Sequence, residues 1–299
     1  METIVAPPAV LPTTGMLLVA TDGSRDADGA VRVGRALARR DEVPLQLLSV
    51  VEPLTVYSPD GIPLPDGARE LVGIAHEARC ATLLDQRDRT HPGTAHWPFL
   101  VETGHRVDTI VGTARRMDAS LILLGLGAHG IGARLSARET SLRVIREAST
   151  PVLAVPSDGW GVPHSALVAV DFTPSSERAA RIALHLLGAE GTLYLAHVTP
   201  RVPIPQGDPR TWEEISQNGV LPRLEALIHR LDPPRGVRVE CVLLHGDPAH
   251  ELVEFAGQQR IDLVAAGTHG RSSLSRLVMG SVSTSLVRSA RCWVLVSPP

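Results

Sequence analysis

The segment DLVAAGTHGRSSLSRLVMGSVSTSLVRSARCWVLVS, residues 262–297, contains the pattern from which the fold can be predicted. It begins with a short apolar run (262–267) and ends with another (292–297), and both are typical of buried strands. A glycine-rich connection and a stretch of helical character (281–290) lie between them. Two apolar strands joined through a helix are typical of a parallel βαβ unit. We therefore predict an α/β protein with a parallel sheet.

The sequence before this segment continues the alternation. Strands are predicted at residues 167–170, 192–198 and 237–246, and helices after Thr173-Pro174, at 212–231 and at 247–260. Thr173 and Pro174 fit the cap and the first turn of a helix. The run 237–246 alternates enough for a strand near an edge of the sheet. With right-handed crossovers, these elements predict a doubly wound, five-stranded parallel sheet covered by helices on both faces.

The same order of elements occurs twice. The segment LLVATDGSRDADGAVR (17–32) matches ALVAVDFTPSSERAAR (166–181) at an offset of 149 residues. Later matches, such as Gly104 with Gly246, have an offset of 142, so the N-terminal copy has about seven extra residues in its middle. A turn-rich stretch, 156–165, separates the copies.

We therefore predict two tandem domains, 15–156 and 164–298, each with a doubly wound five-stranded parallel sheet. Each copy ends with an apolar strand, at 151–156 and 293–297. Exposed apolar edge strands pair readily with other strands. We expect antiparallel pairing of the two to join the copies into an intramolecular pseudo-dimer. A homodimer of tandem chains is left open.

The glycine-rich connection is a candidate phosphate site. Gly267 and Gly270 allow the backbone to turn sharply and to approach a ligand closely. Gly280 and Ser281 are expected to place free N–H groups and a hydroxyl at a helix N-terminus, where the helix dipole favours anions. Ligands of open α/β sheets bind beyond the carboxyl ends of the strands, so Asp171, at the end of the first strand, is expected in the same crevice. The alternative is that the glycines only make a tight strand-to-helix connection.

The spacing Gly-x2-Gly-x9-Gly-Ser in GTHGRSSLSRLVMGSVS (267–283) resembles the ATP-binding signature of the universal stress protein family. The resemblance covers 15–156 and 164–298 and implies a fold like that of the adenine nucleotide α-hydrolases, with ATP as ligand. It implies contacts to ATP from Ala169, Val170, Asp171, Val198, Gly267, Thr268, His269, Gly270, Arg271, Gly280, Ser281, Val282 and Ser283.

The resemblance also assigns roles. Residues 169–171 lie at the adenine and ribose, and the backbone of Val198 binds the adenine edge. Residues 267–271 wrap the ribose and phosphates, and 280–283 hold the phosphates. Asp171 is a candidate ligand for a Mg²⁺ held mainly by the phosphates. Its alternatives are a hydrogen bond to the ribose or to its own helix N-terminus, so the metal ligands are left open.

The N-terminal copy departs from this signature. At the repeat offset Gly270 becomes Ala128, and Gly280-Ser281 becomes Arg138-Glu139. Glu139 would place a carboxylate where phosphates should lie, which repulsion disfavours. A register shifted to Gly127 and Gly130 puts Thr140-Ser141 at the phosphate position, still without glycine. We expect weak or no ATP binding in this half.

Bulk properties narrow the function classes. The chain of 299 residues has a net charge of −3, so no attraction to nucleic acid or to an anionic membrane is expected. It has three widely spaced cysteines and no apolar run long enough to span a membrane, and it does not begin with a secretory signal, so we expect a cytoplasmic protein.

Three functions remain open. The leading hypothesis is an ATP-binding regulatory protein of the stress response. The second is a slow ATPase or a phosphoryl- or nucleotidyl-transferring enzyme, and the third is a nucleotide-free scaffold. His269 has no partnered nucleophile in the sequence, and no Walker lysine or GxSxG motif occurs, so we expect no catalytic residue.

Overall fold

The computed structural model describes residues 15–53, 65–93, 98–126, 134–199, 212–268 and 280–299. The strands of the N-terminal half are β1 (Met16–Ala20), β2 (Leu45–Val51), β3 (Phe99–Thr103), β4 (Ala119–Gly125) and β5 (Val152–Val155). Its helices are the 3₁₀ helix η1 (Arg25–Ala27), α1 (Asp28–Asp41), α2 (Pro65–Thr90), α3 (Arg106–Arg116) and α4 (Arg134–Glu147).

The C-terminal half repeats this order. Its strands are β6 (Ser165–Ala169), β7 (Gly191–Thr199), β8 (Val237–His245), β9 (Leu263–Gly267) and β10 (Trp293–Ser297). Its helices are α5 (Pro174–Leu187), α6 (Trp212–Leu231), α7 (Pro248–Gln258) and α8 (Ser281–Ser289). Each strand and helix predicted for this half is present, with ends that differ by one or two residues.

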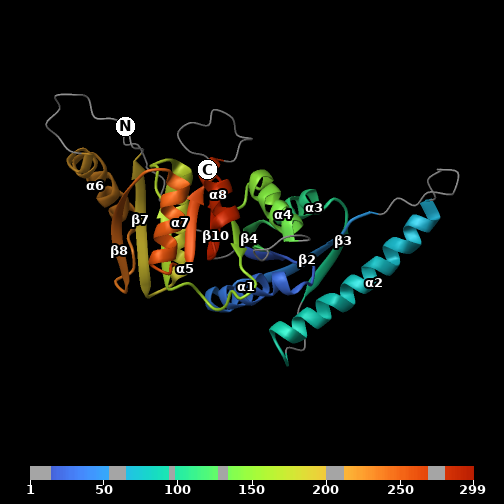
Figure 1. The fold of residues 1–299 in the computed structure, drawn as a ribbon. Coiled ribbons are helices and arrows are strands. Elements are labelled where there is room, and N and C mark those ends of the chain that lie inside the picture. Colours follow the sequence, from blue (N-terminus) through green and yellow to red (C-terminus); the bar gives the residue numbers. More distant parts are fainter. Residues whose placement is uncertain (1–14, 54–64, 94–97, 127–133, 200–211, 269–279) are drawn as a thin grey trace, which may run out of the picture.

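The described strands form one ten-stranded sheet in the order β3-β2-β1-β4-β5-β10-β9-β6-β7-β8 (Figure 1). Neighbouring strands within each half are parallel, and β1 lies beside β4 as β6 lies beside β9. The two halves meet where β5 and β10 pair antiparallel, with Leu153 opposite Leu295. The predicted doubly wound fold and the pairing of the two final strands are confirmed. The strand predicted near an edge, β8, is the last of the sheet.

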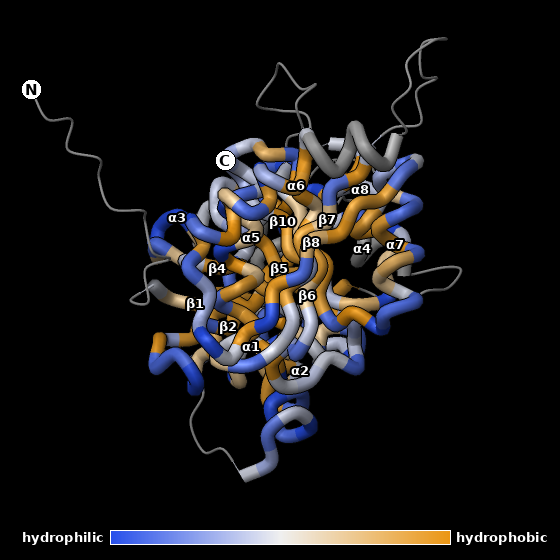
Figure 2. The backbone as a smooth tube through the Cα atoms, turned by 90° about the vertical axis from the view of Figure 1, so that its left-hand side faces the viewer, coloured by the Kyte–Doolittle hydropathy of each residue, from blue (hydrophilic) through white to orange (hydrophobic). Residues whose placement is uncertain are grey.

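Helices cover both faces of this sheet, and each face has its own apolar core. On one face α1, α5 and α6 pack against strand residues such as Val19 and Leu195. On the other face α3, α4, α7 and α8 pack against the alternate residues, such as Leu18 and Ala196. Figure 2 shows the strands as a hydrophobic centre with hydrophilic segments outside. Both cores run through both halves, so each half contributes residues to the same two cores.

A helix cap forms at Thr173, as predicted, and a second one forms at Asp247. The side chain of Thr173 accepts a hydrogen bond from the N–H of Ser176, and Pro174 begins α5. Asp247 caps α7 in the same way, by accepting from the N–H of His250. Each cap satisfies one of the N–H groups that the first turn of a helix leaves without a partner. These caps fix the point where each helix leaves the carboxyl end of the sheet, which is where the candidate site lies.

Candidate functional site

A cavity of about 200 Å³ lies at the carboxyl ends of β6, β7 and β9, beside the start of α8. Nine of the residues predicted to bind a ligand line it: Ala169, Val170, Asp171, Val198, Gly267, Gly280, Ser281, Val282 and Ser283. They come from four separate segments of the chain. The predicted residues His269, Gly270 and Arg271 lie outside the described residues.

Five further residues line the same cavity and were not predicted: Ala196, His197, Pro248, Leu252 and Ala266. Ala196 and Ala266 lie near the carboxyl ends of β7 and β9, where their methyl groups leave space. Pro248 and Leu252 are four positions apart on α7 and therefore share one helix face. The strands and the helix that carry these two pairs were predicted, so the pairs could have been found from the sequence. The alanines were overlooked because a search for polar motifs does not consider small side chains at strand ends.

Thr268, predicted as a contact to the ribose and phosphates, makes backbone hydrogen bonds to two other segments. It is only 4% exposed and does not line the cavity. Its N–H donates to the carbonyl oxygen of Ser297 at 2.8 Å, and its own carbonyl oxygen accepts from the N–H of Gly280 at 2.7 Å. Thr268 thus connects the end of β9 to the last strand and to the start of α8. Its backbone therefore brings the end of β9 and the start of α8 together.

The same bond corrects a prediction about Gly280. Its N–H is held by Thr268 and is not free for a ligand. Its φ of −59° and ψ of 150° are accessible to any residue, so this position does not require glycine's conformational range. The first helical N–H groups, from Ser281 to Ser283, have no carbonyl one turn back to bind. These residues and the dipole of α8 make the start of this helix the candidate position for an anion.

Gly267 is glycine because of a close packing contact. A Cβ at this position would lie 2.5 Å from Oγ and 2.8 Å from Cβ of Ser175, near the start of α5. In the N-terminal half, a Cβ at Gly125 would approach the carbonyl oxygen of Asp26 to 2.8 Å. Both glycines let the first helix of their half sit close against the fourth strand. Gly267 also lines the cavity, and its role in ligand approach stays a prediction.

The carboxylate of Asp171 binds its own helix N-terminus, which was one of its predicted alternatives. Its Oδ1 accepts from the N–H of Thr173 at 3.0 Å and from the Thr173 hydroxyl at 2.6 Å. The same turn occurs in the other half, where the N–H of Ser24 donates to Asp22 at 3.0 Å. Asp171 therefore borders the cavity in a fixed orientation. Among the described residues, no three His, Cys, Asp or Glu side chains gather into a group that could hold a metal ion.

Aromatic and cationic side chains stack beside Asp171. Phe172 has a φ of 63°, a conformation that bulky residues rarely adopt. Its ring centre lies 5.0 Å from that of His197 and 3.8 Å from the guanidinium carbon of Arg223 on α6. The contact with Arg223 favours this position of the ring, since a cation over an aromatic face is attractive. In the N-terminal half the corresponding residue is Gly23, with a φ of 80°.

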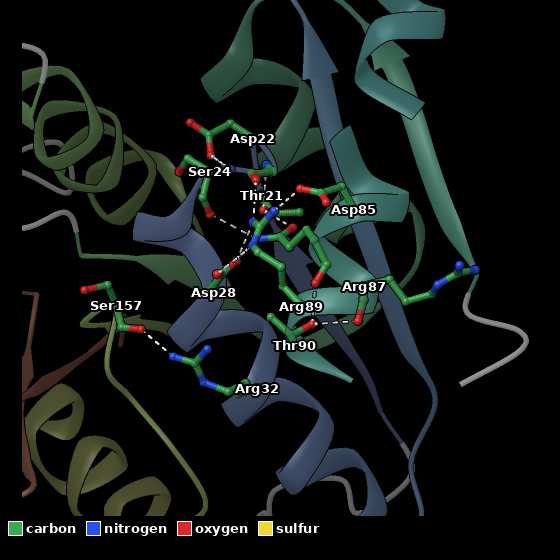
Figure 3. A network of polar contacts seen from close by, with 12 residues as sticks. Thr21, Asp22, Ser24, Asp28, Arg32, Asp85, Arg87, Arg89, Thr90 and Ser157 are labelled. Atoms are coloured by element: carbon green, nitrogen blue, oxygen red, sulfur yellow. Dashed lines mark hydrogen bonds and ion pairs between the residues drawn. The ribbon is translucent and has the colours of Figure 1, made fainter. Parts of the chain in front are cut away.

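The N-terminal half has a smaller cavity, about 90 Å³, at the equivalent place. It is bordered by a buried polar network that joins the turn after β1 to α2 (Figure 3). The hydroxyl of Thr21 donates to Gln86 at 2.9 Å, and the Gln86 amide donates to Asp28 at 2.9 Å. Arg89 donates to both carboxylate oxygens of Asp28, and this hydrogen bonding raises the pKa of Arg89 above its usual value.

At the repeat offset of 149, Thr21 corresponds to Val170. Gln86, four residues before the end of α2, corresponds by its place in the helix to Leu227, four residues before the end of α6. An apolar contact surface thus takes the place of the polar network there. In the N-terminal half the network holds the turn after β1 in place. In the C-terminal half the turn after β6 is held by Asp171 and by the stacked Phe172. The two halves therefore share a fold but differ in what borders each cavity.

Comparison with known proteins identifies the family. The model of the universal stress protein family matches twice, at residues 15–156 and 164–298. The chain belongs to the universal stress protein family. A universal stress protein of Mycolicibacterium smegmatis is 30% identical over 296 residues, covering 95% of this chain and 97% of that protein. One from Mycobacterium tuberculosis is 27% identical over 293 residues, covering 94% and 96%.

A solved structure shows the same fold. The crystal structure of a universal stress protein from Archaeoglobus fulgidus aligns with a TM-score of 0.63 at 18% sequence identity, covering 95% of this chain and 98% of that one. The family, predicted from the glycine spacing, and the tandem architecture, predicted from the internal repeat, are thus established together.

Proposed function

We propose that this chain is an ATP-binding universal stress protein with a regulatory role in the stress response, and that it holds one nucleotide, in the C-terminal cavity. One observation carries the proposal. Nine residues predicted as ligand contacts, from four segments of the sequence, line a single cavity at the point where β6 and β9 lie side by side. This is where open α/β sheets bind their ligands.

The chemistry of the walls fits an adenine nucleotide. Ala169, Ala196, Val198 and Ala266 give an apolar surface for a base, and Asp171 stands at the rim where a ribose or a phosphate-bound Mg²⁺ would lie. The start of α8 offers N–H groups and a positive dipole end to the phosphates. Among the described residues of this cavity, the hydroxyl of Ser283 donates to the carbonyl oxygen of Gly267, and a ring nitrogen of His197 lies 2.6 Å from the carbonyl oxygen of Val170. These contacts engage a candidate nucleophile and a candidate base separately, which favours binding over turnover.

The cellular setting proposed is the cytoplasm. Cys80, Cys241 and Cys292 are all free thiols, which fits a reducing compartment. Burial raises the pKa of the Cys292 thiol to about 11, so it stays protonated and unreactive at neutral pH. Within the described parts of the chain, no helix combines the length and apolar character needed to cross a membrane.

The decisive experiment measures nucleotide content and stoichiometry. Acid extraction of the purified protein should release adenine nucleotide, and calorimetric titration of the stripped protein with ATP should give one site per chain. Two sites would contradict the assignment to one half, and no binding would contradict the proposal as a whole. Release of ADP during incubation with ATP and Mg²⁺ would instead identify the chain as a slow ATPase.

A further inference from the structure

The N-terminal cavity is the pseudo-symmetric counterpart of the C-terminal one, but its walls are bulkier. The strand registers define the equivalent positions: Ala20 lies opposite Leu48 on β2, whereas Ala169 lies opposite Ala196 on β7. On the fourth strands, Leu124 precedes Gly125 as Ala266 precedes Gly267. Two isobutyl groups thus project where the C-terminal half has methyl groups.

These substitutions account for the smaller space. The cavity measures about 90 Å³, against about 200 Å³ in the C-terminal half. Leu48, Val50, Ile110 and Leu124 form an apolar floor. A purine base that fits between alanines has no room between these leucines, because packed interiors do not yield by the width of a ring. The ligand of this cavity is therefore compact and partly apolar.

The rim of the cavity carries two cations. Arg79 on α2 donates to the carbonyl oxygen of Asp22, and Arg106 is the first residue of α3. In the C-terminal half the first residue of the equivalent helix, α7, is Pro248. Both arginine side chains line the cavity. The N-terminal cavity thus has a positively charged arginine at the helix start where the C-terminal cavity has an uncharged proline.

The present partners of Arg106 are weak enough for a ligand to replace them. Its guanidinium pairs with Glu52 at 3.0 Å and lies 3.5 Å from the hydroxyl of Thr140. The side chains of Arg106 and Glu52 are 40% and 51% exposed, so their ion pair is weak. A ligand carboxylate in the less hydrated cavity can replace Glu52, because arginine binds carboxylates through two parallel hydrogen bonds.

The rim also limits the charge of the ligand. Asp22 and Asp26 are also lining residues of the cavity. Two aspartates at the rim would repel a dianion such as phosphate more strongly than a monoanion, and a dianion would leave the apolar floor uncovered. A singly charged ligand with a short alkyl group satisfies the arginine and the floor together.

We propose that the N-terminal cavity binds a short-chain monocarboxylate, with its carboxylate on Arg106 and its alkyl group against Leu48 and Leu124. This site is separate from the proposed nucleotide site and does not depend on it. The tandem chain would then carry two cavities of common origin with different ligand classes.

Titration with butyrate tests the proposal, with saturation-transfer NMR on the full chain as the readout. Butyrate should bind the parent protein, and Arg106→Gln should weaken binding about tenfold or more, because a charge-assisted pair is lost. The matched control is Arg230→Gln, which breaks the comparably exposed ion pair of Arg230 with Glu177 in the other half. The control should bind butyrate like the parent.

A second variant covers the case in which Arg106→Gln fails to fold. Glu52→Gln removes the competing surface carboxylate and should tighten butyrate binding several-fold. Equal butyrate binding in the parent, Arg106→Gln and Glu52→Gln proteins would overturn the proposal. Displacement of butyrate by saturating ATP would also overturn it, because the two ligands would then share a site. Equal affinity for inorganic phosphate would overturn it as well, because the ligand would then need no alkyl group.

Discussion

The hydroxyl of Ser283 donates a hydrogen bond to the carbonyl oxygen of Gly267 at 2.6 Å, and Ser141 makes the same bond to Gly125 at 3.1 Å in the other half. Both serines are 2% exposed. Each bond links the last helix of its half to the end of the fourth strand, from the first turn of α8 in one half and from the middle of α4 in the other. Because the bond persists in the half that lacks the glycine-serine signature, its role is structural in both halves.

Ser283→Ala should therefore destabilise the protein more than it weakens binding. Loss of the hydroxyl leaves a buried carbonyl oxygen with one partner fewer, at a cost of about 1–2 kcal/mol. Chemical denaturation should show this loss for Ser283→Ala and for Ser141→Ala alike. Ser281→Ala, on the exposed start of the same helix, is the control and should unfold like the parent. A stability equal to the parent for Ser283→Ala would mean that the bond contributes nothing net.

Gly280 tests the phosphate position. Because its backbone angles are open to any residue, Gly280→Val should fold with the N–H bond to Thr268 intact. The added side chain would occupy the space beside the first turn of α8, where the phosphates are proposed to bind. Losing two or three charge-assisted contacts of about 1.5–3 kcal/mol each should lower ATP affinity by a factor on the order of a hundred or more.

The control for Gly280 is the equivalent position of the first copy. Arg138→Val should leave ATP affinity unchanged in calorimetric titration, since no nucleotide is proposed there. ATP binding by Gly280→Val as tight as in the parent would show that the phosphates do not lie at the start of α8.

Gly267→Ala should act on folding. Its Cβ would meet Ser175 and the backbone of α5 at 2.5–3.0 Å, distances that require a helix to shift. Overpacking of this kind typically costs about 1–3 kcal/mol. Thermal unfolding should therefore show a lower midpoint even without nucleotide. A variant that unfolds like the parent but no longer binds ATP would instead restore the predicted role of Gly267 as a ligand contact.

The fold could be predicted almost completely because its signals are local. Apolar runs, the cap at Thr173 with Pro174, and the repeat itself each indicate an element without tertiary information. The antiparallel junction of β5 with β10 followed from two apolar edges in one chain. Even the proline at position 222 did not disturb the helix prediction for α6, which includes it.

The site was harder to predict, because its contacts depend on packing between distant segments. The sequence shows the glycine spacing but not that Thr268 captures the N–H of Gly280, or that Ser175 is what Gly267 accommodates. Nor does it show that Phe172 adopts a left-handed conformation, since the stacking with Arg223 becomes visible only once α6 is docked. The network around Gln86 was missed for the same reason: a buried glutamine on a long helix has no local signature.

The last prediction concerns how the halves are held together in acid. Asp41, at the end of α1, accepts from Arg40 at 2.6 Å and pairs with His185 of α5 at 3.0 Å, while Arg40 also donates to the carbonyl oxygen of Leu186. Burial raises the pKa of Asp41, but the hydrogen bond and charge of Arg40, together with His185, outweigh it and hold this pKa below its usual 3.8. The stabilisation is therefore present above about pH 4 and is lost as the pH falls through the lower pKa of the folded state.

Asp41→Asn should consequently cost about 1 kcal/mol at pH 7, a modest value because the ion pairs still face water on one side. The difference from the parent should shrink as the pH is lowered from 5 toward 3, because the parent's carboxylate then becomes protonated. Denaturant unfolding at several pH values measures this. The control Asp88→Asn, whose side chain is 66% exposed, should show little difference at any pH. A cost for Asp41→Asn that persists undiminished at pH 3 would mean that the Asp41 side chain holds the halves together by its shape and hydrogen bonds rather than by its charge.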